Sequence, residues 1–172
     1  MLRLVLLFAL VCPVVAHAQA PVAADAETFV VTGLRIDESD PPPGSAVGRA
    51  GATLDDGTYL HVVHGKPYAR GRKVFGGLVG YDQIWSTGAH MATELVVTDF
   101  VTVGGQTLAP GAYALFTTPR ENEPWSLHLN SHPGQHLADE YDAALDVVVA
   151  EMTRYEADSY EQSLVYDFMP VE

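Results

Sequence analysis

The residues best suited to chemistry gather between positions 64 and 94. The run from Trp85 to Glu94 places an aromatic ring, three hydroxyls, an imidazole and a carboxylate within ten residues. In a wet groove, Trp85 could stack on a polar ligand while Thr87 and His90 fix its orientation. His90 and Glu94 are the candidate catalytic residues, as a general acid and base. The alternative is that Trp85 belongs to the core and that Thr87-Gly88 only turns the chain.

The segment just before this run is unusual in its charge. Residues 57–81 contain no Asp or Glu, although the chain has 22 acidic residues. The same stretch carries Lys66, Arg70, Arg72 and Lys73, and positive side chains suit a carboxylate, phosphate or sulfate. We therefore predict that the region binds a small polar ligand, either an anion or a glycan. The predicted ligand-binding residues are His64, Lys66, Arg70, Arg72, Trp85, Thr87 and His90. The alternative is that these cations pair with acids elsewhere in an acidic fold.

Patterns for metal or nucleophilic catalysis are absent from the sequence. It contains neither H-E-x-x-H nor G-x-S-x-G. His61 and His64 are three residues apart, so on a regular strand they point to opposite faces. We therefore predict no metal site, with a His64, His90 and Glu94 cluster as the alternative. No cofactor can be assigned from the sequence. Three functions are compatible with it: a ligand-binding domain, a hydrolase or isomerase, and a structural domain of the cell envelope. The sequence does not decide whether the protein is an enzyme.

The first twenty residues have the pattern of a secretory signal. Arg3 precedes an apolar run from Leu4 to Val15, and small residues follow at cleavage spacing. Removal of this segment would also remove Cys12, the single cysteine, which would exclude disulfides. We expect a periplasmic or secreted protein without a membrane span. We expect an N-terminal segment with a proline-rich linker over 21–45 and a single β-rich domain over 46–172.

The net charge of the chain limits which classes of partner are expected. Nine Lys and Arg stand against 22 Asp and Glu, which gives a formal net charge of -13. Nucleic acids and anionic membrane surfaces repel such a chain, so neither is an expected partner. The small polar ligand is the partner that the sequence favours.

Short β-type runs separated by turn residues predict an all-β fold. Candidate strands are 28–36, 49–54, 58–64, 93–103, 112–117, 125–130, 147–153 and 164–169. Asp55-Asp56-Gly57, Gly104-Gly105 and Pro110-Gly111 supply the turns. One short helix is predicted over 136–145, where Leu137, Tyr141 and Leu145 recur every four residues. The pattern favours an antiparallel β-sandwich or a partly closed barrel with one short helix.

Several strings together resemble a known family. They are GKPYARGRKVFGGLVGY (65–81), WSTGAHMATEL (85–95), VGGQTL (103–108), PGAYALFTTP (110–119) and WSLHLN (125–130). They resemble domain-of-unknown-function family 2911, whose bacterial members are typically exported, over about residues 41–169. The resemblance implies the compartment and the fold but no established activity. This chain departs from the family pattern at His64, Gly80, Ser86 and His90, where the family commonly has tyrosine, proline, arginine and asparagine.

Overall fold

The computed structural model describes residues 44–153 and 161–169. Its elements in chain order are β1 (Ala46–Thr53), β2 (Tyr59–Lys66), β3 (Thr93–Val97), β4 (Val101–Val103), β5 (Gln106–Leu108), β6 (Gly111–Thr118), β7 (Trp125–Asn130), the 3-10 turns η1 (Ala138–Glu140) and η2 (Ala143–Leu145), and β8 (Asp146–Met152). The predicted signal at 1–20 and the predicted strand at 28–36 lie outside the described residues.

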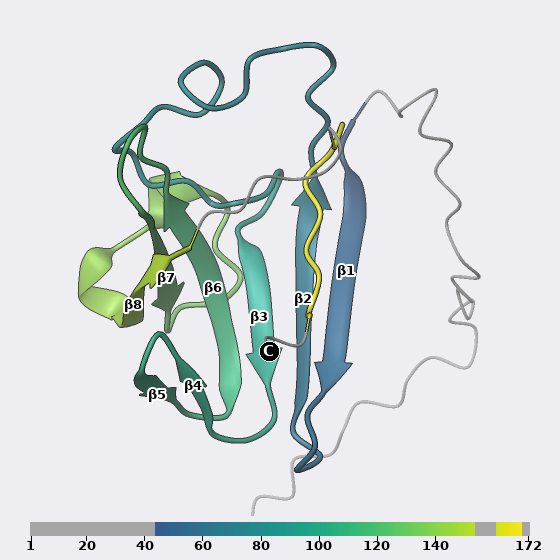
Figure 1. Cartoon of the computed structure of the whole chain (residues 1–172), viewed down its shortest axis with the longest axis vertical. Helices are drawn as coiled ribbons and strands as arrows, with labels where there is room; N and C mark the ends of the chain where they lie inside the picture. Colours follow the sequence, from purple (N-terminus) through teal and green to yellow (C-terminus); the bar gives the residue numbers. More distant parts are fainter. Residues whose placement is uncertain (1–43, 154–160, 170–172) are drawn as a thin grey trace, which may run out of the picture. The chain divides into compact units, whose positions relative to one another are not determined.

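The strands form one six-stranded antiparallel sheet and one hairpin. The order in the large sheet is β1-β2-β3-β6-β7-β8, so β1 and β8 are its edges, and β4 pairs only with β5 (Figure 1). This confirms the antiparallel all-β class, with a large sheet that does not close on itself. The predicted strand 93–103 is interrupted, because the Thr98 side chain accepts a hydrogen bond from the Tyr59 backbone and Asp99 accepts one from the Phe100 backbone.

The prediction of one helix over 136–145 is wrong in detail. Two single 3-10 turns, η1 and η2, take its place. Tyr141 and Asp142 between them have extended backbones, and the Asp142 side chain accepts a hydrogen bond from the Ala144 backbone at 2.9 Å. An Asp that caps the backbone starts a new turn rather than continuing a helix.

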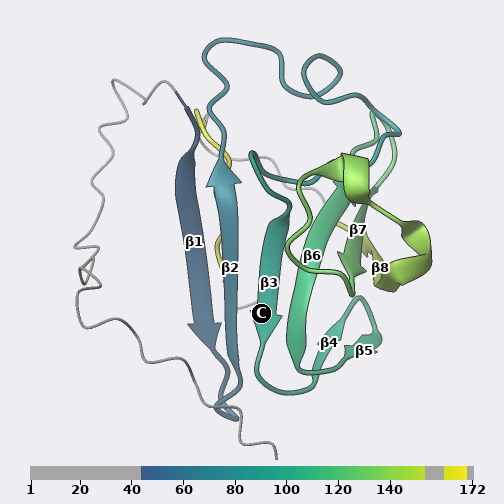
Figure 2. The same cartoon turned by 180° about the vertical axis from the view of Figure 1, so that it is seen from behind.

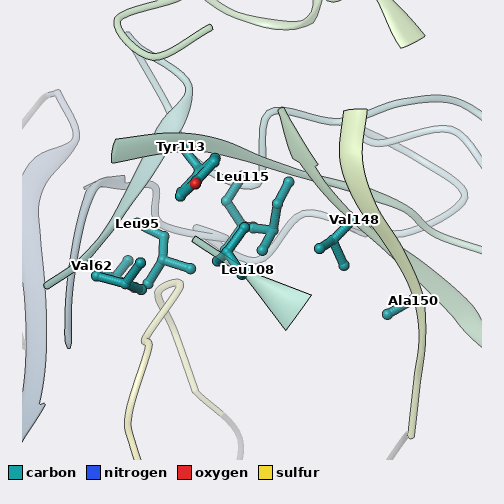
Figure 3. Close-up of a cluster of buried hydrophobic side chains, with 9 residues drawn as sticks. Val62, Leu95, Leu108, Tyr113, Leu115, Val148 and Ala150 are labelled. Atoms are coloured by element: carbon teal, nitrogen blue, oxygen red, sulfur yellow. The ribbon is translucent and has the colours of Figure 1, made fainter. Parts of the chain in front are cut away.

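Alternation along the strands builds the main core on one face of the large sheet, and Ala114 and Phe116 belong to a separate, smaller buried cluster. Val62, Leu95, Leu115 and Val148 point to this face, and Figure 3 shows them together with Leu108 of β5. Each is at least 90 % buried, and full burial of such a side chain contributes about 1.5–3 kcal/mol.

The C-terminal residues 161–169 cover part of this core face. Tyr166 and Phe168 pack against the cluster. The segment runs along β2 in both views but forms no regular strand, unlike the strand predicted over 164–169 (Figures 1 and 2).

A long connection between β2 and β3 arcs over one end of the sheet (Figures 1 and 2). The backbones of Trp85 and Thr117 exchange two hydrogen bonds, at 2.8 and 2.9 Å. The Thr87 carbonyl oxygen accepts from the Thr93 hydroxyl at 2.8 Å and from the Tyr166 hydroxyl at 3.0 Å. The connection is thereby tied to the sheet and to the C-terminal segment.

The same connection lies directly against β2 at a glycine. A Cβ atom on Gly65 would overlap the backbone carbonyl of Ala89. Because a backbone atom cannot move aside as a flexible side chain can, this close approach requires glycine.

We expect Gly65→Ala to lower the free energy of unfolding by about 1–3 kcal/mol, the usual effect of forcing extra volume into a packed site. Urea denaturation measures it. Gly44→Ala is the matched control, since a Cβ atom there would have no heavy atom within 4 Å. Equal effects of the two substitutions would contradict the close packing of the connection.

Candidate functional site

A cleft of about 630 Å³ lies where the β2–β3 connection meets the C-terminal segment. Residues 67–79 form one wall and residues 161–165 form the other. Backbone hydrogen bonds join the two walls, from Ala69 to the Gln162 carbonyl at 2.7 Å and from Leu164 to the Pro67 carbonyl at 3.1 Å. The cleft is therefore a product of two segments that are far apart in sequence.

Aromatic rings form much of the cleft. Phe75 meets Trp85 edge to face, with ring centroids 5.7 Å apart, and it meets Trp125 in the same way at 4.6 Å. Phe75 and Trp85 line the cleft, while Trp125 supports Phe75 from outside it. Aliphatic side chains of Val74, Leu78, Val79 and Leu164 complete a mainly apolar lining. Such a surface suits the carbon skeleton of a ligand.

Several polar side chains interrupt the apolar lining. The Arg72 side chain donates to the backbone carbonyls of Ala69 at 3.0 Å and of Tyr68 at 2.9 Å, which fixes the guanidinium in the wall. Within the part of the chain that the structure describes, neither Arg72 nor Lys73 forms an ion pair. The only acid on the cleft, among the described residues, is Glu161. The lining therefore carries more positive than negative charge.

Tyr68 is the least expected polar residue of the lining. The residue lines the cleft and is only 5 % exposed. Its hydroxyl is buried without a hydrogen-bond partner among the described residues. A buried polar atom in this state costs about 1–3 kcal/mol, so it requires an explanation.

Of the residues predicted from sequence, the structure brings Arg72 and Trp85 together in the cleft. His64 does not line it. The His64 ring is 4 % exposed, lies edge to face on Tyr166 at 4.7 Å, and has Nδ1 3.1 Å from the Gly65 carbonyl oxygen. Burial lowers the pKa of His64 below its ordinary value, so the ring is neutral near pH 7 and attracts no anion.

The other predicted ligand-binding residues also lie outside the cleft lining. Arg70 donates to the Gly44 backbone carbonyl at 2.9 Å. The Thr87 hydroxyl is buried 3.0 Å from the Thr117 hydroxyl, where it holds the connection in place. Lys66 at the end of β2 is half-buried, and His90 is exposed in a left-handed backbone conformation with φ of 71°.

The catalytic candidates His90 and Glu94 do not gather at the cleft. Thr93 is buried on the core face, and alternation along β3 turns Glu94 to the opposite face. There Glu94 Oε1 accepts a hydrogen bond from the Gly134 backbone at 2.7 Å. Its role in the structure is to hold the loop after β7. Over residues 44–153 and 161–169, no three His, Cys, Asp or Glu side chains are placed to hold a metal ion.

Sequence reasoning did not select Tyr68, nor Lys73 as a site residue, nor the wall at 161–165. Tyr68 and Lys73 lie in the acid-free stretch that the sequence singles out, so a signal for them existed. No comparable signal marks 161–165, because its pairing with Pro67 spans almost a hundred residues.

A second polar cluster lies on the sheet face opposite the core. His128 Nε2 is 3.0 Å from the Thr118 hydroxyl and Nδ1 is 3.0 Å from Asp146 Oδ2. The order hydroxyl, imidazole, carboxylate is that of a nucleophilic triad. The Tyr141 hydroxyl also donates to Asp146, and burial next to that carboxylate raises the pKa of Tyr141.

The cluster continues into the loop that precedes η1. The Asn130 side chain donates to Asp146 Oδ1 at 2.9 Å and to the Asp142 carbonyl, and Gln135 donates to Asn130 Oδ1 at 2.9 Å. Asp146 thus receives hydrogen bonds from three side chains, which fasten residues 131–146 over the sheet. We assign the cluster to stability, because its hydrogen bonds join residues 131–146 to the sheet and none of its members lines the cleft.

We expect Asp146→Ala to lower the free energy of unfolding by about 3 kcal/mol, since it leaves several buried donors without an acceptor. Thermal and urea denaturation measure it. Asp139→Ala is the control, because Asp139 is exposed and contacts only the exposed His136 among the described residues. It should leave the stability nearly unchanged, and a similar stability for the two variants would contradict the structural role.

Comparisons with known proteins give one result. The model of a family described as a protein of unknown function (DUF2911) matches residues 47–172. No curated protein and no solved structure matches the chain significantly. No helix among the described residues has the length and hydrophobicity needed to cross a membrane.

Proposed function

The chain belongs to the DUF2911 family of proteins of unknown function, and we propose that its domain binds a small amphipathic organic anion in the cleft. The observation that carries the proposal is the buried hydroxyl of Tyr68, a residue that lines the cleft, which has no hydrogen-bond partner among the described residues. A ligand oxygen that accepts from this hydroxyl would satisfy the buried group.

The charge of the cleft favours an anion. Arg72 and Lys73 line it without carboxylate partners in the described chain, although acidic residues outnumber basic ones by 22 to 9. An arginine held in place by two backbone carbonyls is preorganised to donate its remaining N–H groups to a carboxylate or phosphate.

The apolar lining favours a hydrocarbon or aromatic body over a glycan. Sugars need many directional hydrogen bonds, whereas Phe75, Leu78, Val79 and Trp85 offer mainly carbon surface. The volume of about 630 Å³ falls in the range of small-molecule sites. An aryl or alkyl carboxylate satisfies both the lining and the charge. If residues 1–20 direct export, the protein meets this ligand in the periplasm or outside the cell.

The geometry of the site supports the other two functions considered from the sequence less well. A hydrolase or isomerase using His90 and Glu94 is not favoured, since Glu94 is engaged with Gly134 on the face opposite the core. A structural or partner-binding domain would present a broad apolar surface without a pocket. The cleft, with its unpartnered polar group, fits a small ligand better.

The test is a screen by thermal shift and calorimetry with charged and neutral versions of the same compounds. Indole-3-acetate, 4-phenylbutyrate and octanoate represent the anions, and their amides or alcohols the neutral controls. We expect at least one anion to bind while its neutral partner does not. Equal binding of charged and neutral forms, or binding of neutral sugars alone, would overturn the proposal.

Tyr68→Phe separates stability from binding. Without ligand, the variant should be as stable as the parent or up to about 1 kcal/mol more stable, because a buried unpartnered hydroxyl is removed. Its affinity for the anion should fall about tenfold through loss of one charge-assisted hydrogen bond. Lys73→Gln should also weaken binding, and Arg120→Gln, at an exposed pair with Asp82, is the charge-matched control. Unchanged affinity in Tyr68→Phe would contradict the role of the hydroxyl.

A further inference from the structure

A second depression lies on the open face of the β1–β2 pair, opposite the core. Its volume is about 420 Å³, and Arg49, Gly51, Tyr59 and His61 line it. Gly51 is paired with His61 across the two strands. A Cβ atom on Gly51 would lie only 3.2 Å from the Tyr59 hydroxyl. The missing side chain therefore leaves a hollow that the Tyr59 hydroxyl borders.

The polar groups of this depression have no partners among the described residues. His61 Nδ1 is buried there without a hydrogen-bond partner. Within residues 44–153 and 161–169, neither the Arg49 guanidinium nor the Tyr59 hydroxyl has a hydrogen-bond or ion-pair partner. The rings of Tyr59 and His61 lie 5.5 Å apart between centroids, so the two residues share one side of the hollow.

Arg49 stands out by its charge. It is the single charged residue of β1, and it is paired with Val63, not with an acid. On the next strand, β3, Val63 is paired with Glu94. The Glu94 carboxylate accepts a hydrogen bond from the Gly134 backbone. In a chain with a net charge of -13, an arginine without an acidic partner is left available to an external anion.

We propose that this depression is a second anion site, which binds the carboxylate or phosphate group of a small molecule. Arg49 supplies two parallel N–H donors, as its planar guanidinium does for both oxyanions. Tyr59 supplies a hydroxyl donor and His61 the ring nitrogen that is not buried. The site shares no lining residue with the cleft, so it is independent of the proposed function.

The test is an NMR titration of the full chain with sodium phosphate and, separately, with sodium acetate, at constant ionic strength. We expect the backbone amide signals of Gly51 and His61 to shift in a saturable manner. Shifts with phosphate alone identify a phosphate site, and shifts with acetate as well identify a general oxyanion site. Both results support the proposal.

Three variants assign the binding to this depression. Arg49→Gln should weaken it about tenfold, the loss expected from about 1.4 kcal/mol of a charge-assisted contact. Gly51→Val should abolish it by filling the hollow, and valine is well accommodated in a strand. Arg120→Gln should leave it unchanged. The proposal is overturned if neither anion shifts these signals at tens of millimolar, or if Arg49→Gln binds as tightly as Arg120→Gln.

Discussion

The carbonyl oxygen of Thr87 is the point on which the rest of the structure depends. It accepts one hydrogen bond from Thr93 on β3 and one from Tyr166 in the C-terminal segment. The backbone of Thr87 is left-handed there, with φ of 50°, a conformation that costs a non-glycine residue about 1–2 kcal/mol. Two buried hydrogen bonds of about 1 kcal/mol each offset that cost. The connection over the sheet and the segment that covers the core are thus fixed by one residue, and the cleft lies between them.

The cleft and the depression share a physical property. Most buried polar groups in the described chain have partners, as the cluster around Asp146 shows. Among the described residues, three buried side-chain atoms have no partner: one belongs to Tyr68 in the cleft, one to His61 in the depression, and one to Gln135, which lines neither. Both hollows also carry an arginine without an acidic partner in the described part of the chain. Unpartnered polar groups lower the stability of the fold, and such groups at a concave surface are typical of a ligand-binding site.

The sequence predicts the elements better than it predicts the site. Trp125 to Asn130 is recovered residue for residue, because its alternation is strict and both ends meet turns. Arg72 comes from the acid-free stretch and Trp85 from the run that follows it, and both residues line the cleft. The sequence groups Glu94 with His90, but Thr93 is buried on the core face. Because side chains alternate along β3, Glu94 points to the opposite face of the sheet. The wall at 161–165 could not be found, since long-range pairing leaves no local pattern. The helix over 136–145 fails because spacing alone does not reveal that Asp142 caps a separate turn.

Amide hydrogen exchange in the Tyr166→Phe variant tests most directly whether the connection and the C-terminal segment depend on the Thr87 carbonyl. The substitution removes one hydroxyl, and burial raises the pKa of Tyr166, so that hydroxyl keeps its proton and donates over the whole neutral range. Tyr113→Phe is the matched control, since its hydroxyl also donates to a backbone carbonyl, that of Ala109, at 2.8 Å. The account predicts that the Leu164 and Thr93 amides both exchange faster in Tyr166→Phe. In Tyr113→Phe, neither amide should exchange faster. Unchanged protection of both amides in Tyr166→Phe would contradict it.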